Sequence, residues 1–306
     1  MNWEKKGLIY TPHFDNTWKD NSALTPTPIL IDKSIIRVYA GFRDTNGISR
    51  IGYVDLDAKN PVKIIKVSEK PVLDIGKSGN FDDNGVILGD VIRKGDELLM
   101  YYVGFQLVKK VKFLAYTGLA ISKNNGESFK RVQETPVLDR KDNSQFFNAI
   151  HSVIYDGEKY KCWLGAGSSW QEINGVDYPS YNVKYVESGD GINFYSKSVD
   201  CLQFKSKNEY RIGRPRVWKI NETYKMIFTW GDKQGNYQMG YAESRNGIDW
   251  DRDDQKLNFL PSQNESWDSN WVSYGVPIEV EGKIYMFYNG NNMGREGFGL
   301  AILKNI

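Results

Sequence analysis

One phrase occurs five times along this chain of 306 residues: a short aromatic run of β-forming residues that ends in glycine. The copies are Arg37–Gly41 (RVYAG), Met100–Gly104 (MYYVG), Lys161–Gly165 (KCWLG), Ile227–Gly231 (IFTWG) and Met286–Gly290 (MFYNG). Their glycines, at 41, 104, 165, 231 and 290, are 59 to 66 residues apart, a spacing typical of repeat architectures. Each unit is rich in Tyr, Phe, Trp, Val and Ile between turn residues, which indicates sheets rather than helix pairs. Five sheets in a ring predict an all-β, five-bladed β-propeller.

Each repeat is predicted to hold four strands, with the aromatic phrase as the second. The innermost strands are expected at 28–31, 85–88, 150–154, 215–218 and 276–280, and two fourth strands at 71–74 and 136–139. The fifth repeat lacks a fourth strand because the chain ends soon after its third. We therefore predict that the segment Leu8–Tyr10 completes the fifth blade beside Phe298–Ile302, which also removes an exposed sheet edge.

Composition limits the classes of function. The repeat fills the chain, so residues 1–306 are interpreted as one domain. Lys+Arg 40 against Asp+Glu 38, with interspersed signs, does not indicate a nucleic-acid partner. No segment reaches the roughly 20 apolar residues of a membrane span, and no signal-peptide pattern opens the chain, so we expect a cytoplasmic protein. Cys162 and Cys201 are expected to be reduced, and two histidines in all do not indicate a metal site. No cofactor is expected.

The candidate site lies in the loops that lead into the innermost strands, because these loops meet at one end of a propeller channel. They combine carboxylates, amides, arginines and aromatic rings, the groups that a sugar site requires. We predict Asp83 and Asp268 as an acid/base pair, with Asp44 as a supporting carboxylate. The predicted substrate ligands are Arg214, His151, Asn291, Trp170 and Tyr274. If these assignments hold, Asp83, Arg214 and Asp268 converge on one pocket.

Each residue also has an ordinary structural interpretation. Asp83 fits a turn in a Gly/Asn-rich loop about as well as it fits catalysis. Arg214 has Glu209 close by in the sequence as an ion-pair partner. His151 fits a hydrogen-bonded channel residue better than a metal ligand.

Four segments resemble the five-bladed propeller superfamily of glycoside hydrolases, which includes arabinanases, β-xylosidases, invertases, levansucrases and mannoside phosphorylases. They are Arg37–Asp57 (RVYAGFRDTNGISRIGYVDLD), Gly79–Asp90 (GNFDDNGVILGD), Arg214–Trp250 and Trp267–Leu300. The chain is also similar to uncharacterised glycosidase-like propellers of bacterial O-antigen and capsule gene clusters. The resemblance spans nearly the whole chain and implies the propeller fold, a sugar or nucleotide-sugar substrate and a role in surface-polysaccharide metabolism.

The sequence departs from the superfamily at its catalytic motifs. No Trp-x-Asn-Asp-Pro-x-Gly nucleophile motif is present, nor is the Glu-Cys pair of invertases or the Glu-Asp-Pro-Arg segment of mannoside phosphorylases. Arg43-Asp44 is similar to the Arg-Asp-Pro of invertases, but Thr45 replaces the proline. Hydrolase, phosphorylase and transferase therefore stay open for an enzyme acting on a glycosidic bond. The alternative is a non-catalytic carbohydrate-binding propeller, which needs no pair of carboxylates at the spacing that glycoside hydrolysis requires.

Overall fold

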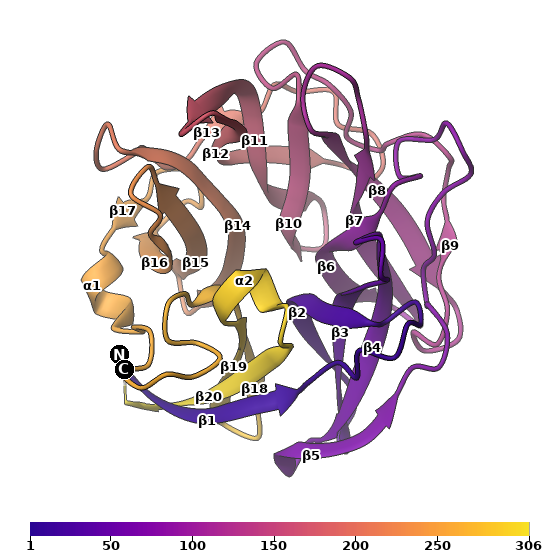
Figure 1. Ribbon diagram of the computed structural model, residues 1–306, viewed down its shortest axis with the longest axis vertical. Coiled ribbons are helices and arrows are strands. Elements are labelled where there is room, and N and C mark those ends of the chain that lie inside the picture. The colour runs from indigo at the N-terminus through magenta and orange to yellow at the C-terminus, as the bar shows by residue number, and fades with distance from the viewer. Residues whose placement is uncertain (306) are drawn as a thin grey trace.

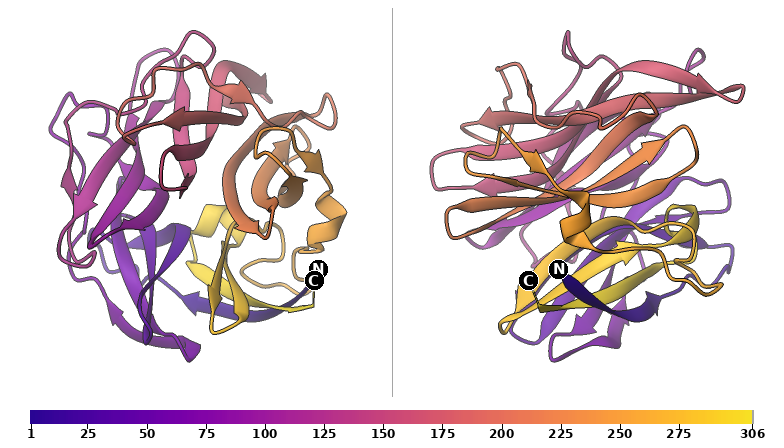
Figure 2. Two further views of the ribbon diagram at one scale, coloured as in Figure 1. Left: turned by 180° about the vertical axis from the view of Figure 1, so that it is seen from behind. Right: turned by 90° about the vertical axis from the view of Figure 1, so that its left-hand side faces the viewer.

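The computed structural model describes residues 1–305, which form twenty β-strands and two four-residue helices. Figure 1 shows the strands arranged around a common centre, and Figure 2 shows the arrangement from behind and from the side. The predicted all-β propeller fold is confirmed. Within residues 1–305, neither helix has the length and hydropathy of a membrane-spanning segment.

The strands pair in five antiparallel groups of four, one for each predicted repeat. Group one is β2 (Asn21–Asp32), β3 (Ile35–Arg43), β4 (Ser49–Asp57) and β5 (Asn60–Val67). Group two is β6 (Val86–Lys94), β7 (Glu97–Gln106), β8 (Leu114–Ser122) and β9 (Lys130–Arg131). Group three is β10 (Phe147–Tyr155), β11 (Tyr160–Ile173), β12 (Val176–Ser188) and β13 (Val199–Asp200). Group four is β14 (Glu209–Ile220), β15 (Thr223–Asp232), β16 (Tyr237–Ser244) and β17 (Asp251–Arg252), followed by α1 (Asp254–Leu257). Group five is β18 (Ser273–Val280), β19 (Lys283–Asn289), β20 (Phe298–Asn305) and β1 (Asn2–Tyr10), with α2 (Asn291–Gly294) after β19.

The innermost strands β2, β6, β10, β14 and β18 each contact the next, and β18 contacts β2. They therefore surround the centre seen in Figure 1. Parallel bridges from β8 to β10 and from β12 to β14 merge groups two to four into one 12-stranded sheet. Hydrogen bonding alone thus does not divide the chain into five blades, and that number stays a prediction from the repeat.

The predicted closure of the chain is confirmed. β1 pairs antiparallel with β20, with Leu8 opposite Gly299 and Tyr10 opposite Phe298. The N- and C-terminal strands consequently lie side by side (Figure 1). This pairing gives group five its fourth strand.

The predicted fourth strands at 71–74 and 136–139 are wrong. β5 and β9 occupy those places, whereas Leu73 and Leu138 each form only an isolated bridge. Both predicted segments begin with proline, which has no N–H to donate to a ladder. The Pro-Val-Leu-Asp echo therefore marks a loop that touches the sheet edge.

In three groups, one aromatic ring of the recurring phrase donates a hydrogen bond to the next group, which gives the phrase a structural role. Tyr39 donates a hydrogen bond to the Gly126 carbonyl at 3.0 Å, and Tyr101 makes the same bond to Gly191. The indole of Trp163 donates to Gly247 at 2.7 Å. In each case a buried ring on a second strand ties its group to the Asn/Asp-Gly turn of the following one. These bonds fix the rings in the interior, where large aromatic side chains contribute most to packing.

Candidate active site

A cavity of about 420 Å³ opens at the centre, at the end where the innermost strands begin. All five innermost strands or the loops before them contribute side chains to its wall. The lining residues that carry polar groups or aromatic rings are Thr25, Arg43, Ser49, Asn84, Phe105, Lys112, Phe113, Phe147, His151, Asp177, Tyr178, Tyr181, Arg211, Arg214, Tyr237 and Tyr274. The wall is therefore basic and aromatic, and Asp177 is its one carboxylate among the described residues.

Each innermost strand shifts register against its neighbour at an equivalent place. The shifts fall at Thr25-Pro26, Gly89, His151, Arg214-Pro215 and Tyr274-Gly275. Such bulges bend a strand and redirect a side chain, and they are common beside active sites. Four of the five bulges contribute a lining side chain: Thr25, His151, Arg214 and Tyr274. The fold thus uses one local irregularity, repeated around the ring, to turn these side chains toward the cavity.

Three of these bulge residues have a strained backbone. Thr25, Arg214 and Tyr274 have φ values of 55°, 52° and 59°, in the left-handed region that side-chain-bearing residues avoid. For a β-branched residue such as Thr25 this conformation is a clear outlier. Strain of this kind costs of order 1–3 kcal/mol per residue and concentrates at functional sites. The outliers point to the cavity as the functional site.

Glycine occupies the remaining bulge for a steric reason. A Cβ on Gly89 would lie 2.2 Å from the carbonyl oxygen of Ile150. The arginine of group four reaches across to this strand, because Nη1 of Arg214 donates to the Leu88 carbonyl. Below this point, Asp90 accepts the Val153 N–H at 2.8 Å and pairs with Arg216. These bonds tie groups two, three and four together around the axis.

Three arginines in the cavity wall lack a carboxylate partner. Within residues 1–305, none of the ion pairs involves Arg43, Arg211 or Arg214. The buried Nε atoms of Arg43 and Arg211 also have no hydrogen-bond partner there. Burial lowers the pKa of Arg214 to about 10, which leaves the guanidinium charged at neutral pH. Because a buried donor without an acceptor is costly, this arrangement suits an anionic ligand that supplies the missing acceptors.

The same group of side chains fixes the protonation of His151. Nη1 of Arg214 lies 3.0 Å from Nδ1 of His151. A guanidinium only donates, so Nδ1 accepts and the ring proton is on Nε2. Burial, with the Arg214 charge beside it, lowers the pKa of His151 well below 6.5. His151 is therefore a neutral hydrogen-bond donor through Nε2.

Aromatic rings form the rest of the wall. Phe147 and Tyr181 stack with centroids 4.9 Å apart. Tyr237 meets Tyr274 edge to face at 5.8 Å and donates a hydrogen bond to its hydroxyl at 2.8 Å. The guanidinium of Arg211 lies 4.3 Å from the Tyr237 ring centre. Such rings cover the apolar face of a sugar and hold the arginines in place.

Of the predicted substrate ligands, the structure brings Arg214, His151 and Tyr274 together in the cavity wall. Trp170 lies one layer behind, edge to face against Phe113 at 5.5 Å. Asn291 is not among the lining residues. Its Oδ1 accepts the backbone N–H groups of Asn270 and Trp271 at 2.8 and 3.0 Å, so it braces the loop before β18.

The predicted carboxylates do not line the cavity. Asp268 is 2% exposed and bonded to Nζ of Lys5 at 2.7 Å, the Tyr288 hydroxyl at 3.0 Å and the Ser266 hydroxyl at 2.8 Å. Group two repeats this arrangement with Asp82, Arg131 and Tyr102, and group four pairs Glu209 with Arg252. In each case an acid before or at the start of the innermost strand binds a base on the outermost strand of its own group. Asp268 thus occupies a repeated structural position, and Glu209 is the partner of Arg252 rather than of Arg214.

The other two predicted carboxylates serve their own loops. Asp83 accepts the Gly79 N–H at 2.8 Å. Asp44 pairs with Arg50 at 2.9 Å and accepts the N–H of Ile48 at 3.0 Å. The predicted convergence of Asp83, Arg214 and Asp268 on one pocket is therefore wrong, since only the arginine lines it.

The predicted site residues do not include several lining residues. Arg43 follows the first aromatic phrase by two residues and Arg211 lies near the start of β14, so both stand in segments that the repeat singles out. Asp177 belongs to the extended hairpin of β11 and β12, which has no counterpart in the other groups and no signal in the repeat.

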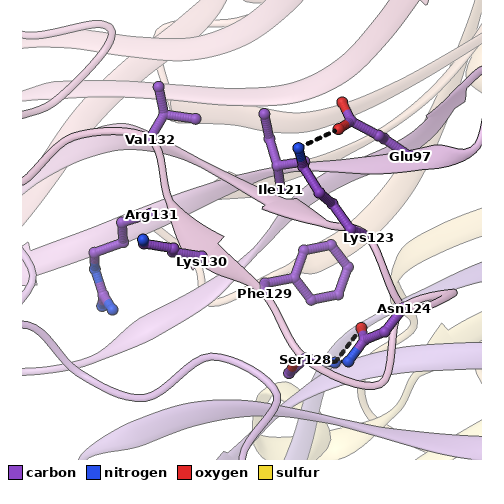
Figure 3. A pocket seen from close by; sticks show the side chains of 9 residues that line it. All are labelled: Glu97, Ile121, Lys123, Asn124, Ser128, Phe129, Lys130, Arg131 and Val132. Carbon is purple, nitrogen blue, oxygen red and sulfur yellow. Dashed lines mark hydrogen bonds and ion pairs between the residues drawn. The ribbon is translucent and has the colours of Figure 1, made fainter.

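A second, shallower hollow of about 700 Å³ lies on the outer side of group two (Figure 3). Lys123 pairs there with Glu97 at 3.2 Å, and Asn124 donates to the Ser128 hydroxyl at 2.9 Å. Since these groups are already satisfied by one another, we place the candidate site in the central cavity.

No protein-family model matches the chain. It is 32% identical over 307 residues to the uncharacterized protein Rv1502 of Mycobacterium tuberculosis, with 100% of both chains covered. It is 31% identical over 165 residues to a 1,2-beta-oligomannan phosphorylase of Thermoanaerobacter sp., which covers 52% of each chain.

Solved structures share the fold at low sequence identity. A glycoside hydrolase superposes with a TM-score of 0.73 and 17% identity, covering 99% of this chain and 92% of the other. An endo-arabinase from Bacteroides thetaiotaomicron VPI-5482 superposes with a TM-score of 0.64 and 12% identity, covering 99% and 98%.

Proposed function

This chain belongs to the same family as the uncharacterized protein Rv1502 of Mycobacterium tuberculosis. We propose that it is a carbohydrate-active enzyme. It acts on a glycosidic bond in the central cavity. The fold that it shares with glycoside hydrolases and the aromatic wall support this proposal. The setting that we propose, from the resemblance to capsule and O-antigen propellers, is surface-polysaccharide metabolism in the bacterial cytoplasm.

The observation that carries the proposal is the group of three arginines without carboxylate partners, Arg43, Arg211 and Arg214. Arginine binds planar oxyanions through paired, charge-assisted hydrogen bonds, which are stronger than those between neutral groups. The reaction therefore involves an anionic group, either on the sugar substrate or as a second substrate such as inorganic phosphate. The partial similarity to a protein named as a phosphorylase favours phosphate.

The carboxylates favour transfer to an anion over hydrolysis. Glycoside hydrolysis ordinarily uses two carboxylates, about 5 to 9.5 Å apart, whereas the described part of this wall presents Asp177 alone. In phosphorolysis a phosphate oxygen attacks the anomeric carbon while the glycosidic C–O bond breaks, and the leaving oxygen takes a proton from a general acid. We assign substrate binding to Arg214, His151 and Tyr274, and the proton-donor role to Asp177.

The test is turnover by the purified protein. The protein is incubated with phosphate and mannosides or other oligosaccharides, and the formation of sugar 1-phosphate is measured. The reverse reaction is measured as the release of phosphate. Nucleotide sugars and aryl glycosides test transfer and hydrolysis. Arg214→Met and Asp177→Asn are expected to lower turnover at least about 100-fold, as for the loss of a general acid or a charged ligand. Arg245→Met, at an exposed arginine, and Asp83→Asn are the matched controls and are expected to stay active.

The second candidate function is a non-catalytic carbohydrate-binding propeller, which the single lining carboxylate favours. It predicts that anionic sugars bind and that Arg214→Met abolishes this binding. It also predicts no turnover with any of these substrates. Full activity in both Arg214→Met and Asp177→Asn would contradict the proposed active site.

A further inference from the structure

The loop between β7 and β8 carries apolar side chains and lysines on one exposed tip. Its residues 107–112 read Leu-Val-Lys-Lys-Val-Lys, and we call this segment the basic loop. Leu107 is 61% exposed and Val108 37% exposed, and Lys109 and Lys110 are exposed beside them. Within residues 1–305, the lysines of the basic loop form no ion pair. Among the described residues, this tip therefore exposes apolar surface beside lysines that have no carboxylate partner.

The basic loop stands at the mouth of the central cavity. Leu107 and Lys112 line that cavity, as does the next residue, Phe113. The base of the loop is held against the β11–β12 hairpin, because Phe113 meets Trp170 edge to face at 5.5 Å and Nζ of Lys112 lies 5.1 Å from the Tyr178 ring centre. The loop is therefore anchored at one end while its apolar tip faces outward.

Other charges near the mouth do not cancel those of the loop. The neighbouring hairpin carries two exposed carboxylates, Glu172 and Asp177, but neither pairs with a lysine of the basic loop. Elsewhere, β5 also exposes apolar side chains, with Ile65 at 52%. Its Lys63 and Lys66 are already paired with Asp57 and Glu127. An unpaired cationic tip with exposed apolar residues is thus a feature of the cavity mouth and not of β5.

We propose that the basic loop docks the protein on an anionic lipid bilayer and presents the cavity to a membrane-anchored substrate. Lysines attract anionic headgroups while short apolar side chains enter the interface, and the two terms together give reversible binding. The charge of the loop is complementary to such a surface. In this arrangement the arginines hold the anionic linkage of a lipid-linked sugar at the membrane surface, a part of the inference that rests on the proposed function.

Vesicle co-sedimentation of the full chain tests the docking without any substrate. Vesicles of phosphatidylglycerol and phosphatidylcholine are compared with vesicles of phosphatidylcholine alone at low salt. Lys109→Glu/Lys110→Glu is expected to lower the partition coefficient at least about 30-fold, since each lysine near such a surface contributes about 1 kcal/mol. Val108→Ser lowers it further, and added salt weakens binding of the unmodified protein. The control is Lys63→Glu with Ile65→Ser on β5, which is expected to bind as the unmodified protein does.

The outcomes separate this inference from the proposed activity. Docking is supported if only the loop variants lose binding to the anionic vesicles, and if Arg214→Met still binds them. Equal binding by the loop variants, equal loss in the β5 control or no vesicle binding at all overturns it. Binding to a soluble acidic polysaccharide without binding to vesicles also overturns it. Any of these results can occur with turnover of free sugars intact.

Discussion

Asp268→Asn is expected to weaken folding rather than chemistry. Its carboxylate is buried and bonded to Lys5, Tyr288 and Ser266, which joins the N-terminal strand β1 to the loop before β18. Removing one member of a buried ion pair costs about 3–5 kcal/mol. Lys5 keeps its bonds to the Leu260 carbonyl and the Ser262 hydroxyl, at 2.8 and 3.1 Å, and its side chain is 24% exposed, so we expect about 2 kcal/mol. For a chain of 306 residues, that loss corresponds to a fall of roughly 3 °C in Tm.

Calorimetry and urea unfolding measure this loss, and Lys5→Met completes a double-mutant cycle. The two substitutions are expected to be less than additive, because each alone removes the same ion pair between Lys5 and Asp268. Asp83→Asn is the control, since this carboxylate holds only a local loop N–H and its replacement is expected to cost less than about 1 kcal/mol. Anion binding in the central cavity is expected to be unchanged in both carboxylate variants.

The pH dependence has a definite sign. Burial acts to raise the pKa of Asp268, but the hydrogen bonds from Lys5, Ser262 and Ser266 and the charge of Lys5 together outweigh it, so the pKa lies below 3.8. The stabilisation is therefore complete above the unfolded pKa near 3.8 and is lost as the pH falls through the lowered pKa. An Asp268→Asn variant with unchanged Tm and severely reduced turnover would refute the structural assignment and restore a role in acid–base chemistry.

Three further predictions concern the cavity. Arg211→Met is expected to weaken the binding of inorganic phosphate, measured by calorimetry, about 10- to 100-fold, and equal affinity would contradict an anion site. Gly89→Ala is expected to cost about 3 kcal/mol of unfolding free energy because its Cβ would meet the Ile150 carbonyl oxygen, and an unchanged Tm would show that the bulge adapts. By NMR, His151 is expected to stay neutral at pH 5.5, since burial and the Arg214 charge lower its pKa; stability then falls as the pH drops below 6.5, where the unfolded chain takes up the proton. A ring titration near pH 6.5 would contradict this.

The repeat in the sequence was sufficient to predict most of the fold. The aromatic-Gly phrase predicted the second strand of each group because aromatic and β-branched residues favour a buried pleated surface. The unpaired edge left by the fifth repeat predicted the pairing of Leu8 and Tyr10 with β20. Pro71 and Pro136 were misassigned to strands because a short apolar run beside proline does not distinguish an edge strand from a loop that touches one.

The site was predictable only in part. Arg214, His151 and Tyr274 line the same cavity because equivalent positions of a closed repeat face the same way, and their role in substrate binding stays a prediction. Sequence position did not show that Asp268 has Lys5 as a partner, since those residues are 263 positions apart in the chain and meet only when β1 completes group five. Arg43, Arg211 and Arg214 are distinguished by having no carboxylate partner among the described residues. Only the packed structure shows which of their N–H groups lack an acceptor.

The sequence by itself determined the all-β repeat and the end of the molecule at which polar side chains gather, because both depend on periodicity and on local β propensity. The tertiary structure alone decided which of those side chains face the cavity. A bulge bends a strand and redirects its side chains, and pairing across the ring decides which charges are neutralised. Of the carboxylates predicted to be catalytic, Asp268 and Asp44 pair with Lys5 and Arg50, and Asp83 accepts a hydrogen bond from its own loop. The arginines without carboxylate partners define the candidate site.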